Sequence, residues 1–318
     1  MSEKNKYIYL LLHIPKTAGY TLKYHIIKNL RNNEYLELTY DNLGLDSNKP
    51  HLEYREYKEA AVNFLSSLSQ DYKKNLKIVY GHLLPYGIHE LFDKEPRYFT
   101  FIRNPVDRTV SLYNFLLNKF QEDKIITGKR CYYKLTLLVN GKIPTFETWL
   151  RYKYDSADLK GFLTASGYLK LRGYIEGNIS NPKSISDGLK KFYFVGITEN
   201  YREESLYIYE QLGFKKYFID QNISNKMFRL GDKEVLINKI IRKNKIDNTL
   251  YKCAVLENRK FKRKNKEYIN IVNRKKIERG VILPFTQLIY APRQSIIRLS
   301  QKLLKNEPIY SNSSYLID

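Results

Sequence analysis

The sequence predicts an α/β fold in three layers, with a central, mainly parallel sheet between helices and a basic helical extension at the C-terminal end. Short apolar runs of strand length recur along the first 200 residues, and segments with helical periodicity separate them. Turn and cap residues stand where each strand would meet its helix. Strands that alternate with helices in this way form βαβ units, whose crossovers make a sheet parallel.

The first strand, loop and helix lie at the N-terminal end of the chain. Residues 7–14 form a continuous apolar run, as a central strand of a parallel sheet does. Pro15 to Gly19 interrupt this run, and residues 21–30 then carry apolar side chains at helical spacing. The next stretch, 31–57, is polar and rich in tyrosine, so we expect a surface excursion there.

The later units repeat this order. Asn104 can cap a helix, Pro105 suits its first position, and Asp107 would lie in its first turn against the helix dipole. Thr198 is expected to cap a further helix, which Gly213 ends. The predicted segments are a helix over 57–68, strands over 77–80, 97–103 and 192–197, and a helix from Asn104 to about Phe120.

The N-terminal apolar run matches neither a membrane span nor an export signal. It is far shorter than the ~20 residues that a membrane span needs. Pro15-Lys16 stands where a signal peptide would place small residues. We therefore expect a soluble, cytoplasmic protein with no transmembrane segment.

The composition favours a folded chain with a polyanionic partner. Of 318 residues, 43 % are hydrophobic, which excludes disorder of the whole chain. Two cysteines, Cys131 and Cys253, are too few for a disulfide framework or a four-thiolate zinc site. The net charge of +22 favours a phosphate-bearing cofactor, an acidic glycan, nucleic acid or anionic lipid. Solvated lysines in a Lys-rich chain would give the same charge.

The C-terminal part differs in character from the rest. From Lys239 to Asp318 there are 19 Lys and Arg against 6 Asp and Glu, a net charge of +13. We divide the chain into a domain over 1–261 and a basic extension over 262–318, which can contact a membrane surface peripherally. The extension also contains apolar residues that can share one helical face: Ile289, Ile296, Ile297 and Leu304. The sequence does not indicate an oligomeric state.

A loop that can bind phosphate follows the first strand. Residues 13–21 read His-Ile-Pro-Lys-Thr-Ala-Gly-Tyr-Thr. The backbone N–H groups of Thr17 to Thr21, the helix dipole and the Lys16 side chain would all favour an anion here. The Walker A spacing is absent, and no downstream strand ends in an aspartate suited to Mg²⁺, which weakens a nucleotide-hydrolysing function.

A second anion site is predicted where the strand over 97–103 meets its helix. Arg103 closes the strand and Ser111 lies two turns into the helix, so both can approach one anion from different sides. Arg108 is a third polar candidate. We expect Arg108 on the surface, paired with Asp107 or with the next turn.

Together the two segments resemble the sulfotransferases that use 3′-phosphoadenosine 5′-phosphosulfate (PAPS), especially the branch of uronyl and heparan sulfate 2-O-sulfotransferases and their bacterial relatives. Residues 13–19 are similar to the loop of that branch that binds the 5′-phosphosulfate, and 101–113 to its 3′-phosphate segment. Residues 194–199 and 247–254 resemble two later blocks, so the likeness spans about residues 7–261. It implies a P-loop-like three-layer fold, PAPS as sulfuryl donor and no metal.

The resemblance implies a role for each matching residue. Arg103 and Ser111 would hold the 3′-phosphate, and Lys16 would also stabilise charge on the leaving 5′-phosphate. Asn225 and Lys226 lie where family members close a loop over the nucleotide. The 5′-phosphosulfate would be held by Lys16, Thr17, Ala18, Gly19, Tyr20 and Thr21.

A base for the acceptor hydroxyl is predicted after the strand over 77–80. The 2-O-sulfotransferases have a His-Gly-His-like segment at this point, and this chain has Tyr80-Gly81-His82. Histidine titrates near neutral pH, so His82 is predicted as the base, with a packed histidine at a strand end as the alternative. Glu90 or Glu199 could serve instead, since some sulfotransferases use a glutamate.

The predicted function is transfer of a sulfuryl group from PAPS to a hydroxyl of a carbohydrate, an acidic one if the basic surface binds it. A P-loop small-molecule kinase would need Mg²⁺ ligands that are not evident. A basic protein that binds nucleic acid or membranes would explain the charge, but the two anion motifs lie far from the densest basic runs, so we expect no nucleic acid. A non-catalytic relative is disfavoured by the presence of Lys16, Arg103, Ser111 and His82.

Overall fold

The computed structural model describes residues 6–46, 53–125, 136–152, 154, 164–218, 228–231 and 233–290. Within this part of the chain, five parallel strands form one sheet in the order β2-β3-β1-β4-β5. The strands are β1 (Tyr7–Leu12), β2 (Tyr35–Leu38), β3 (Ile78–Gly81), β4 (Glu95–Ile102) and β5 (Phe194–Ile197). The predicted α/β fold with a central parallel sheet is confirmed.

The central strand β1 is buried on both faces. Ile8, Leu10 and Leu12 pack into the core on one face of the sheet, and Tyr9 and Leu11 into the core on the other. A strand between two helical layers needs apolar side chains at consecutive positions, which is why its sequence shows no alternation. The continuous run of apolar residues is therefore the correct signal for this position in the sheet.

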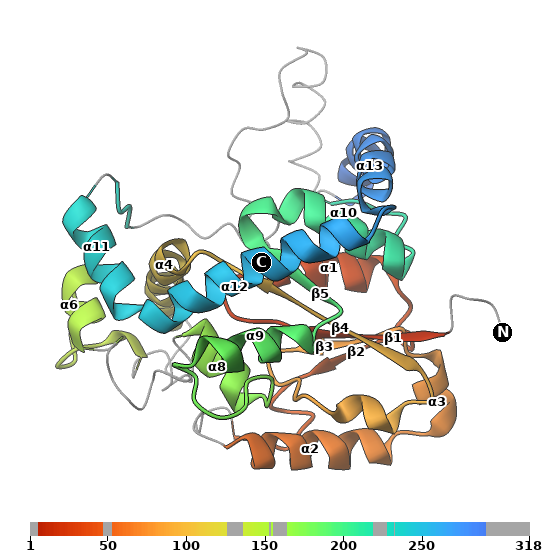
Figure 1. Cartoon of the computed structure of the whole chain (residues 1–318), viewed down its shortest axis with the longest axis horizontal. Coiled ribbons are helices and arrows are strands. Elements are labelled where there is room, and N and C mark those ends of the chain that lie inside the picture. Colours follow the sequence, from red (N-terminus) through yellow and green to blue (C-terminus); the bar gives the residue numbers. More distant parts are fainter. Residues whose placement is uncertain are drawn as a thin grey trace.

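Helices cover both faces of the sheet, which makes three layers (Figure 1). One layer packs against Leu10 and contains α2 (Tyr54–Ser67), α8 (Ala165–Leu171), α9 (Pro182–Lys190) and α12 (Lys245–Lys264). The other packs against Leu11 and contains α1 (Gly19–Asn29), α10 (Tyr201–Leu212) and α13 (Tyr268–Tyr290). The predicted P-loop-like, three-layer arrangement is confirmed.

A smaller cluster lies beside the carboxyl ends of the strands. It is built around Trp149 and joins α4 (Pro105–Ile125), α6 (Phe146–Tyr152) and α11 (Glu234–Lys243). The first turn of α4 has the predicted cap, because the Asn104 side chain accepts the backbone N–H of Val106 at 2.9 Å. The cluster fixes α4 next to the sheet edge where β1, β3 and β4 end.

Two local predictions are wrong. The stretch 31–57 contains β2, which pairs with β3; a short, partly exposed edge strand has no continuous apolar run to reveal it. Thr198 does not cap α10, because the 3₁₀ turn η3 (Thr198–Asn200) separates it from the helix and its hydroxyl has no hydrogen-bond partner in the described part of the chain. The Glu204 carboxylate, from inside α10, instead accepts the Ile197 N–H at 2.6 Å.

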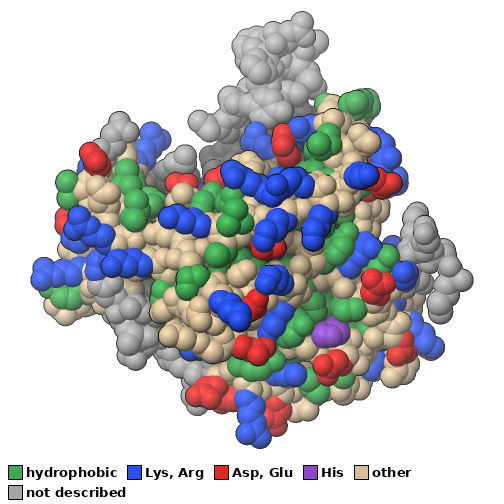
Figure 2. Space-filling model, in the orientation of Figure 1, with side chains coloured by type: hydrophobic (Ala, Val, Ile, Leu, Met, Phe, Trp, Pro, Cys, Tyr) green, Lys and Arg blue, Asp and Glu red, His purple; other side chains and the backbone are tan. Residues whose placement is uncertain are grey.

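The described part of the basic extension packs on the fold. Tyr268, Ile271 and Val272 of α13 belong to the same core cluster as α10. Figure 2 shows Lys and Arg side chains along α12 on the face in view. The division at residue 261 stays a prediction, and the apolar face expected over 289–304 lies outside the side chains that the structure describes.

Candidate active site

The loop between β1 and α1 has the backbone shape of an anion cradle. Lys16 and Ala18 both have positive φ angles, 69° and 64°, with Thr17 between them. Alternation of left- and right-handed residues turns successive backbone N–H groups to one side of the chain, where they can bind an anion. The Thr17 side chain is buried, and its hydroxyl donates to the Ile14 carbonyl at 2.8 Å, which closes the loop.

The His13 ring explains why glycine stands at position 19. A Cβ added to Gly19 would lie 1.9 Å from His13 Cδ2, so only glycine lets the imidazole lie against the first residue of α1. Tyr20, the next residue, is half exposed, and the Thr21 side chain is buried. His13 and Gly19 are therefore in direct contact, and both help to shape the cradle.

Helix α4 contributes the opposite wall of the loop. Arg103, just before α4, donates from Nη1 to the Lys16 carbonyl at 3.2 Å. Arg108 donates from Nε to the Pro15 carbonyl at 3.2 Å. Lys16 Nζ lies 4.5 Å from the centroid of the Phe115 ring. Ser111 lies three residues after Arg108 and four before Phe115, so it occupies the same face of α4, toward the loop.

The expected surface position of Arg108 is wrong. Its side chain is 1 % exposed, and Nη1 lies 3.9 Å from a carboxylate oxygen of Asp247 on α12. The sequence showed Asp107 one residue away and could not show an aspartate that approaches from α12. Arg108 is thus buried and contacts both the loop and α12.

The loop carries an excess of positive charge. Burial, and after it the nearby cations Arg103, Lys119 and Arg108, lower the pKa of Lys16 to about 8. An anion bound among these groups would stabilise the charged ammonium and raise that pKa. Lys119 was not predicted from the sequence, although its spacing of four residues after Phe115 could have indicated it.

His82 follows β3 and lies directly beside this loop. Its Nδ1 lies 2.6 Å from the His13 carbonyl oxygen, and the two imidazole rings stack with centroids 4.1 Å apart. Since a carbonyl only accepts, Nδ1 carries the proton and Nε2 keeps its lone pair. The structure thus holds His82 in the tautomer that a base acting through Nε2 requires.

The pKa of His82 is lower than usual. Burial is the main cause, the hydrogen bond to the His13 carbonyl opposes it, and the Arg172 charge lowers the pKa further. Although many protein atoms surround it, His82 is exposed to solvent. Because its pKa is lowered, the His82 imidazole is neutral at neutral pH.

Two side chains that the sequence did not reveal, those of Tyr168 and Arg172, hold the His82 backbone. Tyr168 donates its hydroxyl to the His82 carbonyl at 2.7 Å, and Arg172 donates Nε to the same oxygen at 3.0 Å. Both come from the region of α8, more than 80 residues further along the chain. No motif marks them, because the contact exists only in the folded protein.

The two alternative bases, Glu90 and Glu199, lie in surroundings that differ from those of His82. Glu199 accepts the Asn104 backbone N–H at 2.9 Å and the Tyr251 hydroxyl at 3.3 Å, so both of its oxygens hold neighbouring elements. Glu90 is exposed on the short turn η2 (Ile88–Leu91). Tyr80, at the position of the first family histidine, is buried with its hydroxyl 3.4 Å from Glu37. Asn225 and Lys226 lie outside the described residues.

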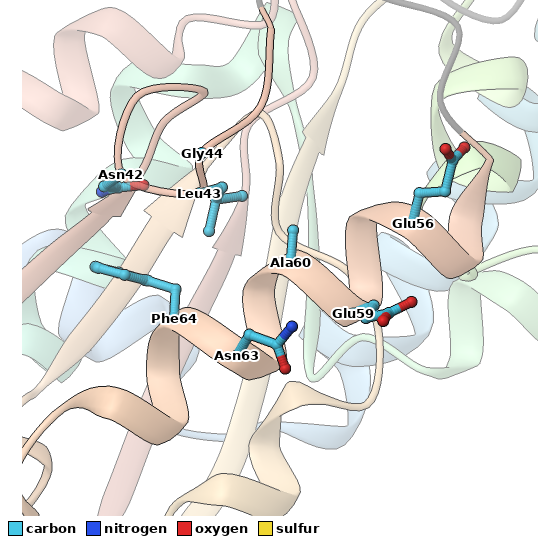
Figure 3. Close-up of a pocket in the computed structure, with 8 residues that line it drawn as sticks. All are labelled: Asn42, Leu43, Gly44, Glu56, Glu59, Ala60, Asn63 and Phe64. Carbon is cyan, nitrogen blue, oxygen red and sulfur yellow. The ribbon is translucent and has the colours of Figure 1, made fainter.

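A separate cavity of about 510 Å³ lies between the loop after β2 and α2 (Figure 3). Leu43, Ala60 and Phe64 supply apolar surface, and Glu56 and Glu59 supply carboxylates. None of the predicted site residues lines it. Carboxylates repel phosphate, so this cavity is not the site for a phosphate-bearing donor.

The residues that the structure describes contain neither a metal-ligand cluster nor a membrane span. They contain no group of three or more His, Cys, Asp and Glu side chains placed to hold a metal ion. Among their helices, none combines the length and the apolar character of a membrane span.

A parallel α/β fold with an anion cradle after its first strand and cations along the facing helix defines an enzyme class that binds phosphate groups through a loop. The match to known families is more specific. The model of the sulfotransferase family matches residues 1–252, so the chain belongs to that family and is a transferase of sulfuryl groups. No curated protein matches the chain. Membership implies PAPS as the donor. The positive charge of the loop and its two residues with positive φ angles fit a phosphosulfate group.

Proposed function

We propose that this protein transfers the sulfuryl group of PAPS to a hydroxyl of a carbohydrate, with Lys16 on the donor side and His82 on the acceptor side. One observation carries the proposal. The cationic loop and a neutral histidine with an available Nε2 lie side by side, joined by the contact of His13 with His82. Sulfuryl transfer needs both an anion-stabilising group and a proton acceptor next to each other.

The donor supplies an activated sulfuryl group. In the proposed reaction, His82 Nε2 accepts the hydroxyl proton while the acceptor oxygen forms its bond to sulfur. The bond between sulfur and the bridging oxygen breaks, and its electron pair stays on the leaving 5′-phosphate. Lys16 and the N–H groups of the loop stabilise that charge as it develops. Arg103, in the β4–α4 junction, and Ser111, in α4, would bind the 3′-phosphate.

We further propose that the acceptor is an acidic glycan. The support is the net charge of +22 and the Lys and Arg side chains along α12, with no excess of carboxylates to neutralise them (Figure 2). The basic extension over 262–318 would contact the acceptor or an anionic membrane, in the cytoplasm. Neutral sugars would then be poor acceptors, because they cannot pair with the Lys and Arg side chains.

A labelled-donor assay tests this function. The protein is incubated with ³⁵S-labelled PAPS and a panel of neutral, uronate-containing and sulfated glycans. We expect label on the acidic glycans only. Label on neutral sugars alone would overturn the acidic acceptor, whereas label on no glycan, despite binding of adenosine 3′,5′-bisphosphate, would overturn the carbohydrate acceptor itself. Phosphorylation by [γ-³²P]ATP in a parallel reaction would instead indicate a kinase.

A further inference from the structure

Helix α8 and Arg172, the residue after it, form hydrogen bonds with the segment that follows β3. Tyr168 and Arg172 donate to one acceptor, the His82 carbonyl oxygen, at 2.7 and 3.0 Å. In the opposite direction, the Tyr86 N–H donates to the Arg172 carbonyl at 2.8 Å. The segment from His82 to Tyr86 is therefore bound to α8 at both of its ends.

Arg172 is an unusual residue to find in this place. Its side chain is fully buried, and its guanidinium lies 3.9 Å from the centroid of the Tyr57 ring and 4.6 Å from that of Tyr168. Contacts with these two rings hold the guanidinium, which restricts the direction in which Nε points. A lysine would keep the charge but lose this directional donor.

Helix α8 is in turn fixed by a carboxylate from α12. Asp247 accepts the backbone N–H groups of Ala165 and Ser166 at 2.7 and 2.9 Å, which caps the first turn of α8. The same carboxylate pairs with Arg108, and Arg108 donates to the Pro15 carbonyl in the anion loop. One buried network thus reaches from the donor loop to the residues that hold His82.

We propose that Arg172 and Tyr168 are positioning residues that hold His82 for proton transfer. This rests on the proposed function, in which His82 is the base. The two donors fix the backbone of His82 from one side, and the His13 carbonyl fixes the imidazole from the other. With both held, Nε2 keeps one direction relative to the loop, as an efficient base requires.

Arg172 also acts on His82 through its charge. Four elements bring titratable or charged groups toward this imidazole: His13 after β1, Lys23 on α1, Glu37 on β2 and Arg172 after α8. Glu37 raises the pKa of His82, whereas Lys23 and Arg172 lower it. Removal of the Arg172 charge must therefore raise that pKa, which leaves more of the imidazole protonated and unable to accept a proton near neutral pH.

Three variants separate the two effects. Tyr168→Phe removes one donor and no charge, so we expect an unchanged His82 titration and a kcat about two- to tenfold lower. Arg172→Lys keeps the charge and loses the directional donor, so we expect the same pattern. Arg172→Met loses both, so the His82 titration and the acidic limb of the kcat profile must move together to higher pH.

The control is Arg97→Met at the amino end of β4. Arg97 also stacks on a tyrosine, with its guanidinium 3.3 Å from the centroid of the Tyr7 ring, but it lies at the opposite edge of the sheet. Its loss should leave the His82 titration in place. Equal shifts in the Arg97 and Arg172 variants would show a general effect on the fold and would overturn the proposal.

NMR of ¹⁵N-labelled histidines measures the titration without any acceptor or PAPS. If Arg172→Met does not fold, Arg172→Lys and Tyr168→Phe still decide the question, because wild-type kcat in both would overturn the positioning role. The readouts also separate two failures. Wild-type protein that sulfates nothing would contradict the proposed function, whereas a His82 titration unmoved in folded Arg172→Met would contradict the role of Arg172.

Discussion

The two sides of the candidate site are built in different ways. The donor side consists of residues 13–21 and the junction before α4, each a short continuous segment in which one strand runs into one helix. The acceptor side consists of one histidine after β3, held by the His13 carbonyl and by two side chains near α8. The first is a local motif, and the second is an assembly of three distant segments.

This difference decides what each side depends on. The conformation of the donor loop follows from its own residues, through Gly19, the closing Thr17 hydroxyl and the positive φ angles. The geometry at His82 follows from tertiary contacts, so a change in Tyr168 or Arg172 can disturb the base without touching the loop. If this is so, substitutions can impair the two sides separately.

The largest expected effect is on the acceptor side. His82→Asn should lower kcat by ~10²–10⁴, the usual contribution of a general base. It should leave the affinity for adenosine 3′,5′-bisphosphate unchanged, because the proposed partner of the imidazole is the acceptor hydroxyl and not a phosphate. Steady-state kinetics and calorimetry on the same preparation measure both. His89→Asn is the matched control, since its imidazole bonds to the Tyr98 hydroxyl instead. A wild-type kcat in the His82 variant would transfer the role of base to a carboxylate such as Glu90.

On the donor side, Lys16→Met should lower kcat at saturating PAPS by about 10²–10³, the effect of losing one group that stabilises transition-state charge. The empty protein should not lose thermal stability, because the neighbouring cations and burial make the Lys16 charge unfavourable there. Thermal melts with and without ligand measure this. A large fall in melting temperature of the empty variant would contradict the assigned charge balance.

Arg103→Met should weaken binding more than turnover. A charged hydrogen bond to a phosphate contributes roughly 1.5–3 kcal/mol, which corresponds to about a ten- to hundredfold rise in Kd. Titration with adenosine 3′,5′-bisphosphate and with the 5′-monophosphate measures the effect. The variant should lose its preference for the bisphosphate, and an equal loss for both nucleotides would place Arg103 away from the 3′-phosphate.

A smaller effect is expected from Gly19→Ala, which should destabilise the fold by about 1–3 kcal/mol through overpacking. Helix propensity alone would predict the opposite, since alanine favours helices over glycine. The new methyl group would displace the His13 ring, and with it the ring that stacks on His82. Urea unfolding measures the stability. An unaffected or more stable variant would show that the His13 contact can relax at no cost.

The sequence predicted the strand, loop and helix starts of the proposed donor side, because their signals are local. The apolar run of β1, the loop with Lys16 and Gly19, and the Asn104-Pro105 start of α4 are all visible within a few residues. His82 directly follows β3, as predicted, and its role as the base stays a prediction. These elements lie where short-range pattern and tertiary structure agree.

The rest depends on contacts that no local pattern contains. Arg108 is buried because Asp247 approaches it from α12, 139 positions later in the numbering. Tyr168 and Arg172 reach His82 only because α8 packs over the end of β3. The edge strand β2 is short and half exposed, so its residues resemble a surface loop. Each case is a tertiary contact that overrides a local reading.

The central claim is that the loop with Lys16 binds the phosphates of the donor, and proton uptake on binding tests it most directly. In the free protein the pKa of Lys16 is about 8. A bound dianion raises that pKa, so at pH 8 binding of adenosine 3′,5′-bisphosphate should take up about half a proton, and its affinity should fall as the pH rises above 8. Calorimetry in two buffers of different ionisation enthalpy measures the uptake, with Lys16→Met as the variant that abolishes it. Tight binding with no proton uptake, equal in wild type and Lys16→Met, would contradict the account.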